Sequence, residues 1–402
     1  MWLFMKPLDT VCCRDSRPFA AGEHGTARTV FPPRPSTFYG ALRSELIAAH
    51  GNGFADFHRP EGEPPPELAE AGTPRRMGTL RLNGIGLAEF DEGAQTCHAL
   101  FPAPAHLVRE HGSAEEASSP RFHRLRLAEN GPLTSDVTDL SLPLQIPMGP
   151  DAPFQAAGGY LTAEAANRFL ADPAAVPDGT DEWRAGGDLS AAAFQVGLTR
   201  VRGARVAAEG RLYSIEHRRL LSRSGTKTGF CLRVGETRKF HAASEGVIRL
   251  GGEGRAAAYR GLDHSPAGAI DRERIAARIA NTGRFFLWLI TPALFPGGWR
   301  PPFLTGEGTE GELEGVKVRL TAVRIPEPVF LGGFRLGPGA SGESKPGFWA
   351  VETGSVYFFD LIGTPAADAV SRLVEARTFY PLPGQIGGME QQGFGATLIG
   401  GN

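Results

Sequence analysis

The sequence predicts an α+β fold that is divided into two strand-rich domains. Its 402 residues are too many for one small core and suit two domains of about 150 to 200 residues each. Short apolar runs of strand length outnumber the segments with helical periodicity. With 53 glycines and 32 prolines, the chain also has the turn residues that many short elements need. A hydrophobic content of 41% is enough for ordered cores.

The chain is expected to begin with a strand, a basic loop and a helix. Trp2–Met5 is an apolar run of strand length, which Pro7 and Asp9 bring to an end. Ser36 or Thr37 is expected to cap the helix that follows the loop. The apolar residues of this helix recur at helical spacing: Phe38, Leu42, Leu46 and Ile47.

A hairpin should follow this helix. Thr79–Phe90 has strand character, with Phe101–Val108 as its expected partner, and Gly84 and Gly86 indicate a bulge or bend. Strand, helix and hairpin in this order open a ferredoxin-like βαββαβ unit. From about His111 to Asp188 the pattern weakens, and only Thr162–Leu170 is clearly helical. We interpret this part as an insert together with the interdomain connection.

The second domain is expected to contain a long β-hairpin. Arg211–Leu221 and Thr228–Val234 are predicted to be its strands, and the polar turn Ser222–Lys227 would give it a basic tip. Such a hairpin is either an ordinary exposed one or a wedge against a nucleic-acid strand. The other predicted elements are helices at Ile270–Ile279 and Ala366–Ala376, strands at Val247–Leu250, Phe285–Ile290, Val316–Ile325, Val329–Leu336, Phe348–Val351 and Val356–Leu361, and a flexible loop at Gly337–Gly347 that holds Lys345.

Arginines of the first loop form a candidate binding site. The net charge of −2 is not that of a strongly basic domain, so any RNA contact must come from local clusters. The first loop carries Arg14, Arg17, Arg28 and Arg34 and leads into a helix N-terminus. Unpaired N–H donors and the helix dipole favour a phosphate site there. A plain solvated loop explains the same residues equally well.

Two glycine-rich stretches are further candidates. The first lies next to Arg255 and consists of Gly251, Gly252 and Gly254. It is either an anion-binding nest or a structural turn, and it does not match a dinucleotide fingerprint. The second holds Gly393 and Gly395 on either side of Phe394, a side chain that can stack on a base or pack in a core.

Motifs spread over almost the whole chain resemble one protein family. They are Arg14-Asp-Ser-Arg17-Pro-Phe, the stretch from Pro33 to Arg43 with its Pro-x-Pro-Ser-Thr-x-x-Gly-Ala-Leu-Arg pattern, Glu209–Tyr213, Leu250–Arg255, and Gly354–Phe359 followed by Gly393-Phe-Gly395. In this order they resemble the third Cmr subunit of type III-B CRISPR effector complexes, a member of the RAMP superfamily.

The resemblance implies a fold and a role. It implies two ferredoxin-like (RRM-like, βαββαβ) RAMP domains with glycine-rich loops, at 1–190 and 191–402, the first containing the insert at about 104–190. The role is a non-catalytic subunit that grips the 5′ repeat-derived tag of the CRISPR RNA. Its expected partners are that RNA, the large palm-domain subunit, the backbone RAMP subunits and, indirectly, the target RNA. The residues expected to contact RNA are Arg14, Arg17, Arg28, Arg34, Arg43, Lys227, Gly251, Gly252, Gly254, Arg255, Gly393 and Gly395.

Rival functions stay open at this point. An RNA-processing endonuclease could use His24 as general acid or base, with Tyr39 or Arg28 assisting. An unrelated metabolite-binding protein could hold a phosphate at the Gly251 loop. The closely related fourth subunit of type III-A complexes is a minor variant of the scaffold hypothesis.

No cofactor, metal or membrane anchor is expected. The richest set of metal-ligand residue types matches no zinc signature in its spacing: Cys97, His98, His106, His111 and His123. The cysteines show no disulfide pattern, and neither a signal peptide nor an apolar run of membrane-spanning length is visible. We therefore expect a soluble cytoplasmic protein.

Overall fold

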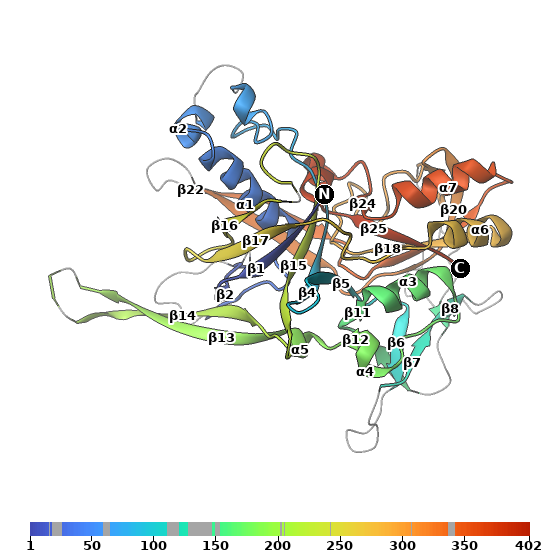
Figure 1. Cartoon of the computed structure of the whole chain (residues 1–402), viewed down its shortest axis with the longest axis horizontal. Helices are drawn as coiled ribbons and strands as arrows, with labels where there is room; N and C mark the ends of the chain where they lie inside the picture. Colours follow the sequence, from blue (N-terminus) through green and yellow to red (C-terminus); the bar gives the residue numbers. More distant parts are fainter. Residues whose placement is uncertain are drawn as a thin grey trace.

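An eight-stranded sheet contains the N-terminal strand in its interior. The computed structural model describes residues 1–15, 17, 26–58, 65–110, 120–127, 147–148, 153–201, 203–204, 206–241, 243–306, 308–336 and 342–402. The sheet is antiparallel, in the order β12-β11-β5-β4-β15-β1-β17-β16 (Figure 1). Its strands are β1 (Trp2–Pro7), β4 (Leu82–Asp91), β5 (Thr96–Pro102), β11 (Tyr160–Thr162), β12 (Trp183–Arg184), β15 (Thr226–Val234), β16 (Glu245–Arg249) and β17 (Ala256–Leu262).

Helix α1 (Pro35–Ala48) covers one face of this sheet. Its Phe38, Leu42 and Leu46 are buried in one core with Leu3 and Met5 of β1. The period of four in the helix and the period of two in the strand both place these side chains on the facing surfaces. The predicted apolar face of the helix is therefore confirmed.

The start of α1 differs from the prediction. The N-cap is Arg34, without a side-chain capping hydrogen bond, and Pro35 is the first helical residue. Proline suits this position because the N–H that it lacks has no acceptor there, and its fixed φ is already helical. Ser36 and Thr37, the predicted caps, consequently lie within the first turn.

A six-stranded antiparallel sheet forms the second half of the fold. Its order is β19-β20-β23-β18-β25-β24, and α6 and α7 lie beside it (Figure 1). The strand β18 is buried along five of its six residues, as its unbroken apolar run predicts. The elements are β18 (Arg284–Leu289), β19 (Glu310–Leu313), β20 (Val316–Arg324), β23 (Val356–Leu361), β24 (Tyr380–Pro381), β25 (Ala396–Gly401), α3 (Ala163–Ala171), α6 (Arg272–Thr282) and α7 (Ala367–Ala376).

Aromatic side chains join the two sheets in a common core. Trp2 meets Phe379 edge-on at 5.4 Å between ring centroids, and Phe101 meets Trp288 at 6.1 Å. The first sheet is thus covered by α1 on one face and by the second half on the other. The fold is α+β, as predicted, but the expected boundary at residue 190 is wrong, because β15, β16 and β17 belong to the first sheet. The chain passes to the second sheet between Leu262 and Arg284.

Two of the predicted strand pairings are also wrong. The partner of β4 is β5, not Phe101–Val108, whose last residues belong to β6 (Leu107–Glu110) in a small separate sheet. β14 (Ala207–Leu220) does not form a hairpin with β15; it pairs with β13 (Ser190–Arg200), and β15 pairs with β1 and β4. The long hairpin that projects from the molecule is therefore β13–β14 (Figure 1).

A second hairpin, β21–β22, replaces the loop predicted around Lys345. Its strands are β21 (Val329–Leu336) and β22 (Gly342–Ala350), and Lys345 lies opposite Gly333 within β22. None of the described helices has the length and apolarity to span a membrane. The remaining short elements are β2 (Thr10–Val11), β3 (Thr26–Ala27), β7 (Phe122–Arg124), β8 (Arg126–Leu127), β9 (Pro147–Met148), β10 (Phe154–Ala156), α2 (Gly53–Phe57), α4 (Gly179–Glu182), α5 (Gly186–Leu189), η1 (Pro66–Leu68) and η3 (Ile386–Gln392).

Candidate nucleic-acid interface

Both ends of the first loop lie against strand β14. β2 runs antiparallel to β14, with Thr10 opposite Arg219, and β3 runs parallel to it, with Ala27 opposite Ile215. Cys12, Ala27 and Ile215 form a small buried cluster under this contact. The loop that the sequence singled out is therefore attached to the base of the projecting hairpin.

The glycine-rich turn between β16 and β17 docks on the same place. The Gly252 N–H donates to the Cys12 carbonyl at 2.7 Å. Gly251 has a φ of +79°, and a Cβ atom there would lie 2.4 Å from the Cys12 carbonyl oxygen, so only glycine fits. A Cβ atom at Gly254, in contrast, would meet open space. The turn is thus a structural one that also brings Arg255 to the first loop.

One carboxylate pairs with two arginines at this junction. Asp9 lies 2.8 Å from the Arg255 guanidinium and 3.7 Å from that of Arg219. Arg255 also donates to the Gln195 side-chain oxygen at 3.2 Å. These bonds tie β13, β14 and the Gly251 turn together, so Arg255 has a positioning role whether or not it meets a ligand.

The arginines of the first loop face solvent. Arg14 and Arg28 are exposed, and the Arg17 side chain is 75% exposed at 3.5 Å from the Asp15 carboxylate. The Asp15 N–H donates to the Arg28 carbonyl at 3.0 Å, which holds the two strands of the loop together. Three guanidinium groups of the first loop are therefore presented to solvent.

Three of the other predicted contacts have partners within the chain. Arg34 donates to the Glu352 carboxylate at 3.4 Å. Arg43 donates to the carbonyls of the 71–76 segment. Lys227 lies in β15, 3.4 Å from Glu92, rather than at a hairpin tip.

The glycine-rich C-terminal stretch is buried. Phe394 is 3% exposed and packs with Leu294 and Ala350, so core packing accounts for it. A Cβ atom at Gly395 would lie 2.5 Å from the Gln385 amide nitrogen, and one at Gly393 would lie 3.0 Å from the Leu82 carbonyl oxygen. Both glycines have positive φ, which explains their residue type by backbone geometry alone.

The candidate catalytic and metal-binding residues do not converge in the described part of the chain. His24 and His111 lie outside the described residues. Tyr39 is 3% exposed, and burial raises the pKa of its hydroxyl. His106 is buried among phenylalanine rings, and the described residues hold no group of three or more potential metal ligands.

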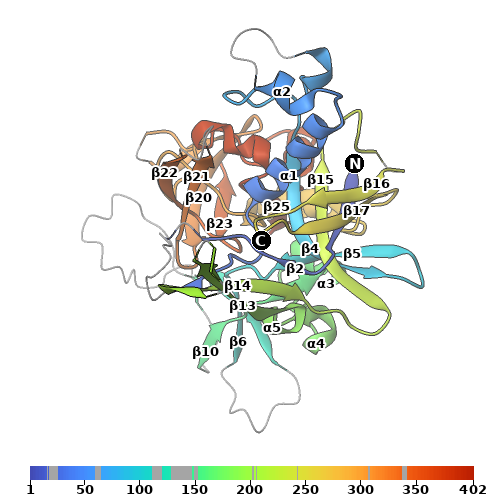
Figure 2. The same ribbon diagram turned by 90° about the vertical axis from the view of Figure 1, so that its left-hand side faces the viewer.

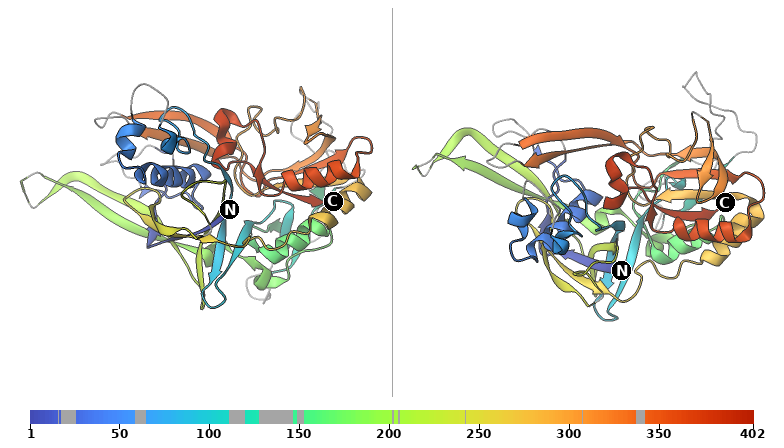
Figure 3. Two further views of the ribbon diagram at one scale, coloured as in Figure 1. Left: turned by 45° about the horizontal axis from the view of Figure 1, so that its top comes forward. Right: turned by 90° about the horizontal axis from the view of Figure 1, so that it is seen from above.

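Exposed apolar side chains follow both projecting hairpins. Phe194, Val196 and Leu198 alternate along β13 on its solvent face. On β21–β22, Phe330 and Trp349 pair across the strands at 5.4 Å and are 48% and 66% exposed. Figure 2 looks onto the side from which these hairpins extend, and Figure 3 shows both from two further directions. The period-two pattern of residues 194–198 was visible in the sequence, but only the topology shows which face it occupies.

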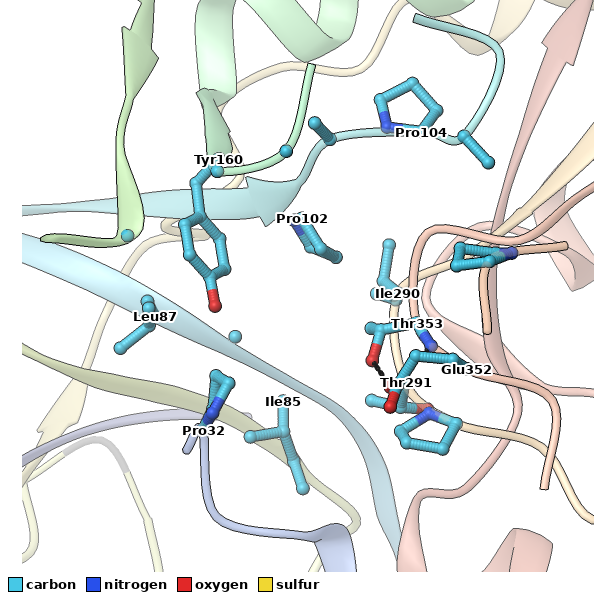
Figure 4. A pocket seen from close by; sticks show the side chains of 18 of the residues that line it. Pro32, Ile85, Leu87, Pro102, Pro104, Tyr160, Ile290, Thr291, Glu352 and Thr353 are labelled. Carbon is cyan, nitrogen blue, oxygen red and sulfur yellow. Dashed lines mark hydrogen bonds between the residues drawn. The ribbon is translucent and has the colours of Figure 1, made fainter. Parts of the chain in front are cut away.

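A cavity of 510 Å³ opens between the two sheets (Figure 4). Its walls are mainly apolar, and the hydroxyl of Tyr160 points into it from β11. Burial raises the pKa of this hydroxyl, so it stays a proton donor. On the opposite wall Glu352 accepts from Arg34 and from the Thr353 side chain. The cavity therefore suits a largely apolar group and offers few free polar contacts.

The comparison with known families decides the identity of the chain. A family profile described as CRISPR-associated protein (Cas_Cmr3) matches residues 3–402. The chain belongs to the Cmr3 family of CRISPR-associated proteins. The family resemblance read from the motifs is thereby confirmed. No curated protein matches this Cmr3-family chain.

Two solved structures are similar to this Cmr3-family chain. One is a cryo-EM structure of the type III-B Cmr-beta bound to cognate target RNA, with a TM-score of 0.47. The other is the same assembly bound to cognate target RNA and AMPPnP in state 1, with a TM-score of 0.45. In both comparisons the sequence identity is 14%, and the match covers 89% of this chain and 86% of the other.

Proposed function

We propose that the chain is a non-catalytic, CRISPR RNA-binding subunit of a type III-B (Cmr) effector complex. Family membership supports its place in such a complex. The RNA-binding part of the proposal rests on one observation, the convergence of three distant segments at β14. There the first loop, with Arg14, Arg17 and Arg28, meets the Gly251 turn and the base of the projecting hairpin.

The proposed chemistry is phosphate neutralisation. Guanidinium groups bind phosphate oxygens through two parallel hydrogen bonds, and Arg14, Arg17 and Arg28 are exposed enough to reach a bound strand. The open space above Gly254 lets an RNA backbone approach the turn closely. Because these contacts are electrostatic, they position the strand and carry little base specificity.

The finer roles follow from the family resemblance and the exposed surfaces. The bound RNA would be the 5′ repeat-derived tag. The large palm-domain subunit and the first backbone subunits would dock on apolar surfaces such as Phe194, Val196 and Leu198, since protein interfaces bury such side chains. Target RNA would be reached only indirectly. Within the two domains, ferredoxin-like topology remains part of this proposal.

The test is the salt dependence of RNA binding by the full chain. A guide RNA with a 5′ tag is titrated at several salt concentrations, and the logarithm of the dissociation constant is plotted against that of the salt concentration. Each phosphate contact to a single strand contributes a slope of about 0.7, so the triple variant Arg14→Gln, Arg17→Gln, Arg28→Gln should lower the slope by about 2. Arg372→Gln, an exposed arginine of α7 paired with Asp368, is the matched control.

The outcome separates the scaffold from the nuclease. If the triple variant keeps the wild-type slope, the first loop is not the RNA interface and the proposal fails. His24→Ala distinguishes the rival: a scaffold keeps RNA affinity and complex assembly, whereas an endonuclease loses cleavage of repeat RNA. Cleavage of that RNA by the purified wild-type chain would favour the nuclease outright.

A further inference from the structure

A second cavity lies near the C-terminus, away from the first loop. It measures 450 Å³ and is bordered by residues 124–127, by Pro173 and Ala174 after α3, and by Thr282, Arg284 and Asn402. Helices α3 and α6 and strand β8 mark its place in Figure 1. Three of the residues that line it are arginines: Arg124, Arg126 and Arg284.

Arg124 is a half-buried cation without a carboxylate in ion-pair contact among the described residues. One of its terminal nitrogens donates to the carbonyls of Phe169 and Asp172 at 3.2 and 3.3 Å. The guanidinium lies 4.3 Å from the Phe169 ring centroid and 4.8 Å from that of Phe286. Its other terminal nitrogen is buried and has no hydrogen-bond partner among the described residues. Burial, together with nearby Arg278, lowers the pKa of Arg124 to about 9.

A half-buried charge is costly to desolvate, and an anion lowers that cost. Hydrogen bonds to carbonyl oxygens and rings solvate the guanidinium only in part. Asp172, the nearby acid, directs its carboxylate to the Ala174 N–H at 2.9 Å. The charge on Arg124 therefore favours a negatively charged ligand in the adjoining cavity.

The two other arginines of the cavity are accessible. Arg126 is exposed and makes no ion pair with the described residues. Arg284 is 3.5 Å from the Asp360 carboxylate, and both side chains are partly exposed, which makes that pair weak and exchangeable. Three guanidinium groups lie around the cavity beside two nearby carboxylates, those of Asp172 and Asp360. Planar guanidinium forks match phosphate oxygens.

We propose that this cavity binds a phosphate group, carried either by RNA or by a free phosphorylated small molecule. The geometry rests on the convergence of Arg124, Arg126 and Arg284 and is independent of the first-loop interface. A volume of 450 Å³ admits a phosphate together with part of the group that carries it. The site would be a second anion-binding position on a chain whose net charge is −2.

The experiment titrates the full chain with inorganic phosphate at constant ionic strength and follows the thermal midpoint. The wild type should be stabilised with a saturable dose response. The double variant Arg126→Gln, Arg284→Gln should bind phosphate at least ten-fold more weakly, while Arg319→Gln, an exposed arginine paired with Glu310, should not differ from wild type. Both exposed positions are chosen so that the variants fold, which the midpoint without phosphate verifies.

RNA binding by the same variants identifies the source of the phosphate. If the double variant also lowers the salt slope for guide RNA, the site holds an RNA phosphate. If phosphate binding weakens while that slope is unchanged, the site holds a free phosphorylated ligand. Equal phosphate affinities in wild type and double variant, or no response of the wild type, would overturn the inference. Neither result depends on the triple variant of the first loop, so the two proposals fail separately.

Discussion

Arg43 provides the sharpest test of a structural against an RNA-binding role. Its Nε donates to the Ala71 carbonyl at 2.6 Å, and one Nη donates to the carbonyls of Thr73 and, at 3.1 Å, Arg76. The guanidinium also lies 5.0 Å from the Phe57 ring centroid. Arg43→Ala should therefore release the 71–76 segment from α1 rather than expose a weakened RNA surface.

The expected loss follows from the number of bonds and their exposure. A hydrogen bond to a charged group contributes about 1.5 to 3 kcal/mol, and the three bonds share one guanidinium and are not additive. Because part of the segment can regain water, we expect Arg43→Ala to lower the free energy of unfolding by about 2 to 3 kcal/mol. Arg43→Lys should recover only part of this, since an ammonium cannot span the same carbonyls.

Urea unfolding and RNA titration of the same variants provide the measurement. Arg43→Ala should move the urea midpoint to lower concentration with an unchanged m-value and leave the RNA salt slope at its wild-type value. Arg372→Ala, an exposed control on α7, should change stability by no more than about 0.5 kcal/mol. A variant with wild-type stability but a reduced salt slope would refute the structural role and show that Arg43 contacts RNA.

Two further predictions concern buried and exposed rings. Burial and the neighbouring Arg124 lower the pKa of His106, so the unfolded chain takes up protons first as the pH falls below about 6.5. Between pH 7.5 and pH 5.5 the wild type should lose about 1.4 kcal/mol of its free energy of unfolding through this group. In urea unfolding, the loss over the same pH range should be smaller by this amount in His106→Leu. An identical pH dependence of the two proteins would refute the role of His106. Trp349→Ala should weaken RNA binding by about 1 to 3 kcal/mol if its exposed ring stacks on a base, whereas Trp349→Phe should retain most of the affinity; equal losses would exclude stacking.

Local hydrophobic periodicity predicted many of the helices and strands, but it could not predict which distant strands pair. The apolar spacing of Phe38, Leu42 and Leu46 identified both α1 and its buried face, and the run at β18 identified a buried strand. Neighbouring strands β14 and β15 looked like a hairpin because a short polar turn joins them. Their true partners are β13 on one side and β1 and β4 on the other, and β1 is about 230 residues away in sequence.

The parts of the candidate site that depend only on residue type and position in a loop could be predicted from the sequence. The first-loop arginines and the Gly251 turn were both found from the sequence, and the fold brings them together. The sequence could not show that Arg43 and Gly395 have structural roles. The carbonyl that accepts from Arg43 and the amide that lies close to Gly395 are brought there only by the tertiary structure. The arginines of the second cavity could not be linked from the sequence, because Arg284 lies far along the chain from Arg124 and Arg126.

The position of β1 also constrains how this protein can be made. Both neighbours of β1, the strands β15 and β17, lie within residues 226–262. At ribosomal rates of about 5 to 20 residues per second, roughly 10 to 45 seconds pass between the synthesis of β1 and that of its first partner. During that interval an apolar strand has two unsatisfied edges, which is the condition for misassembly. The first sheet can therefore be completed only after residues 226–262 have left the ribosome.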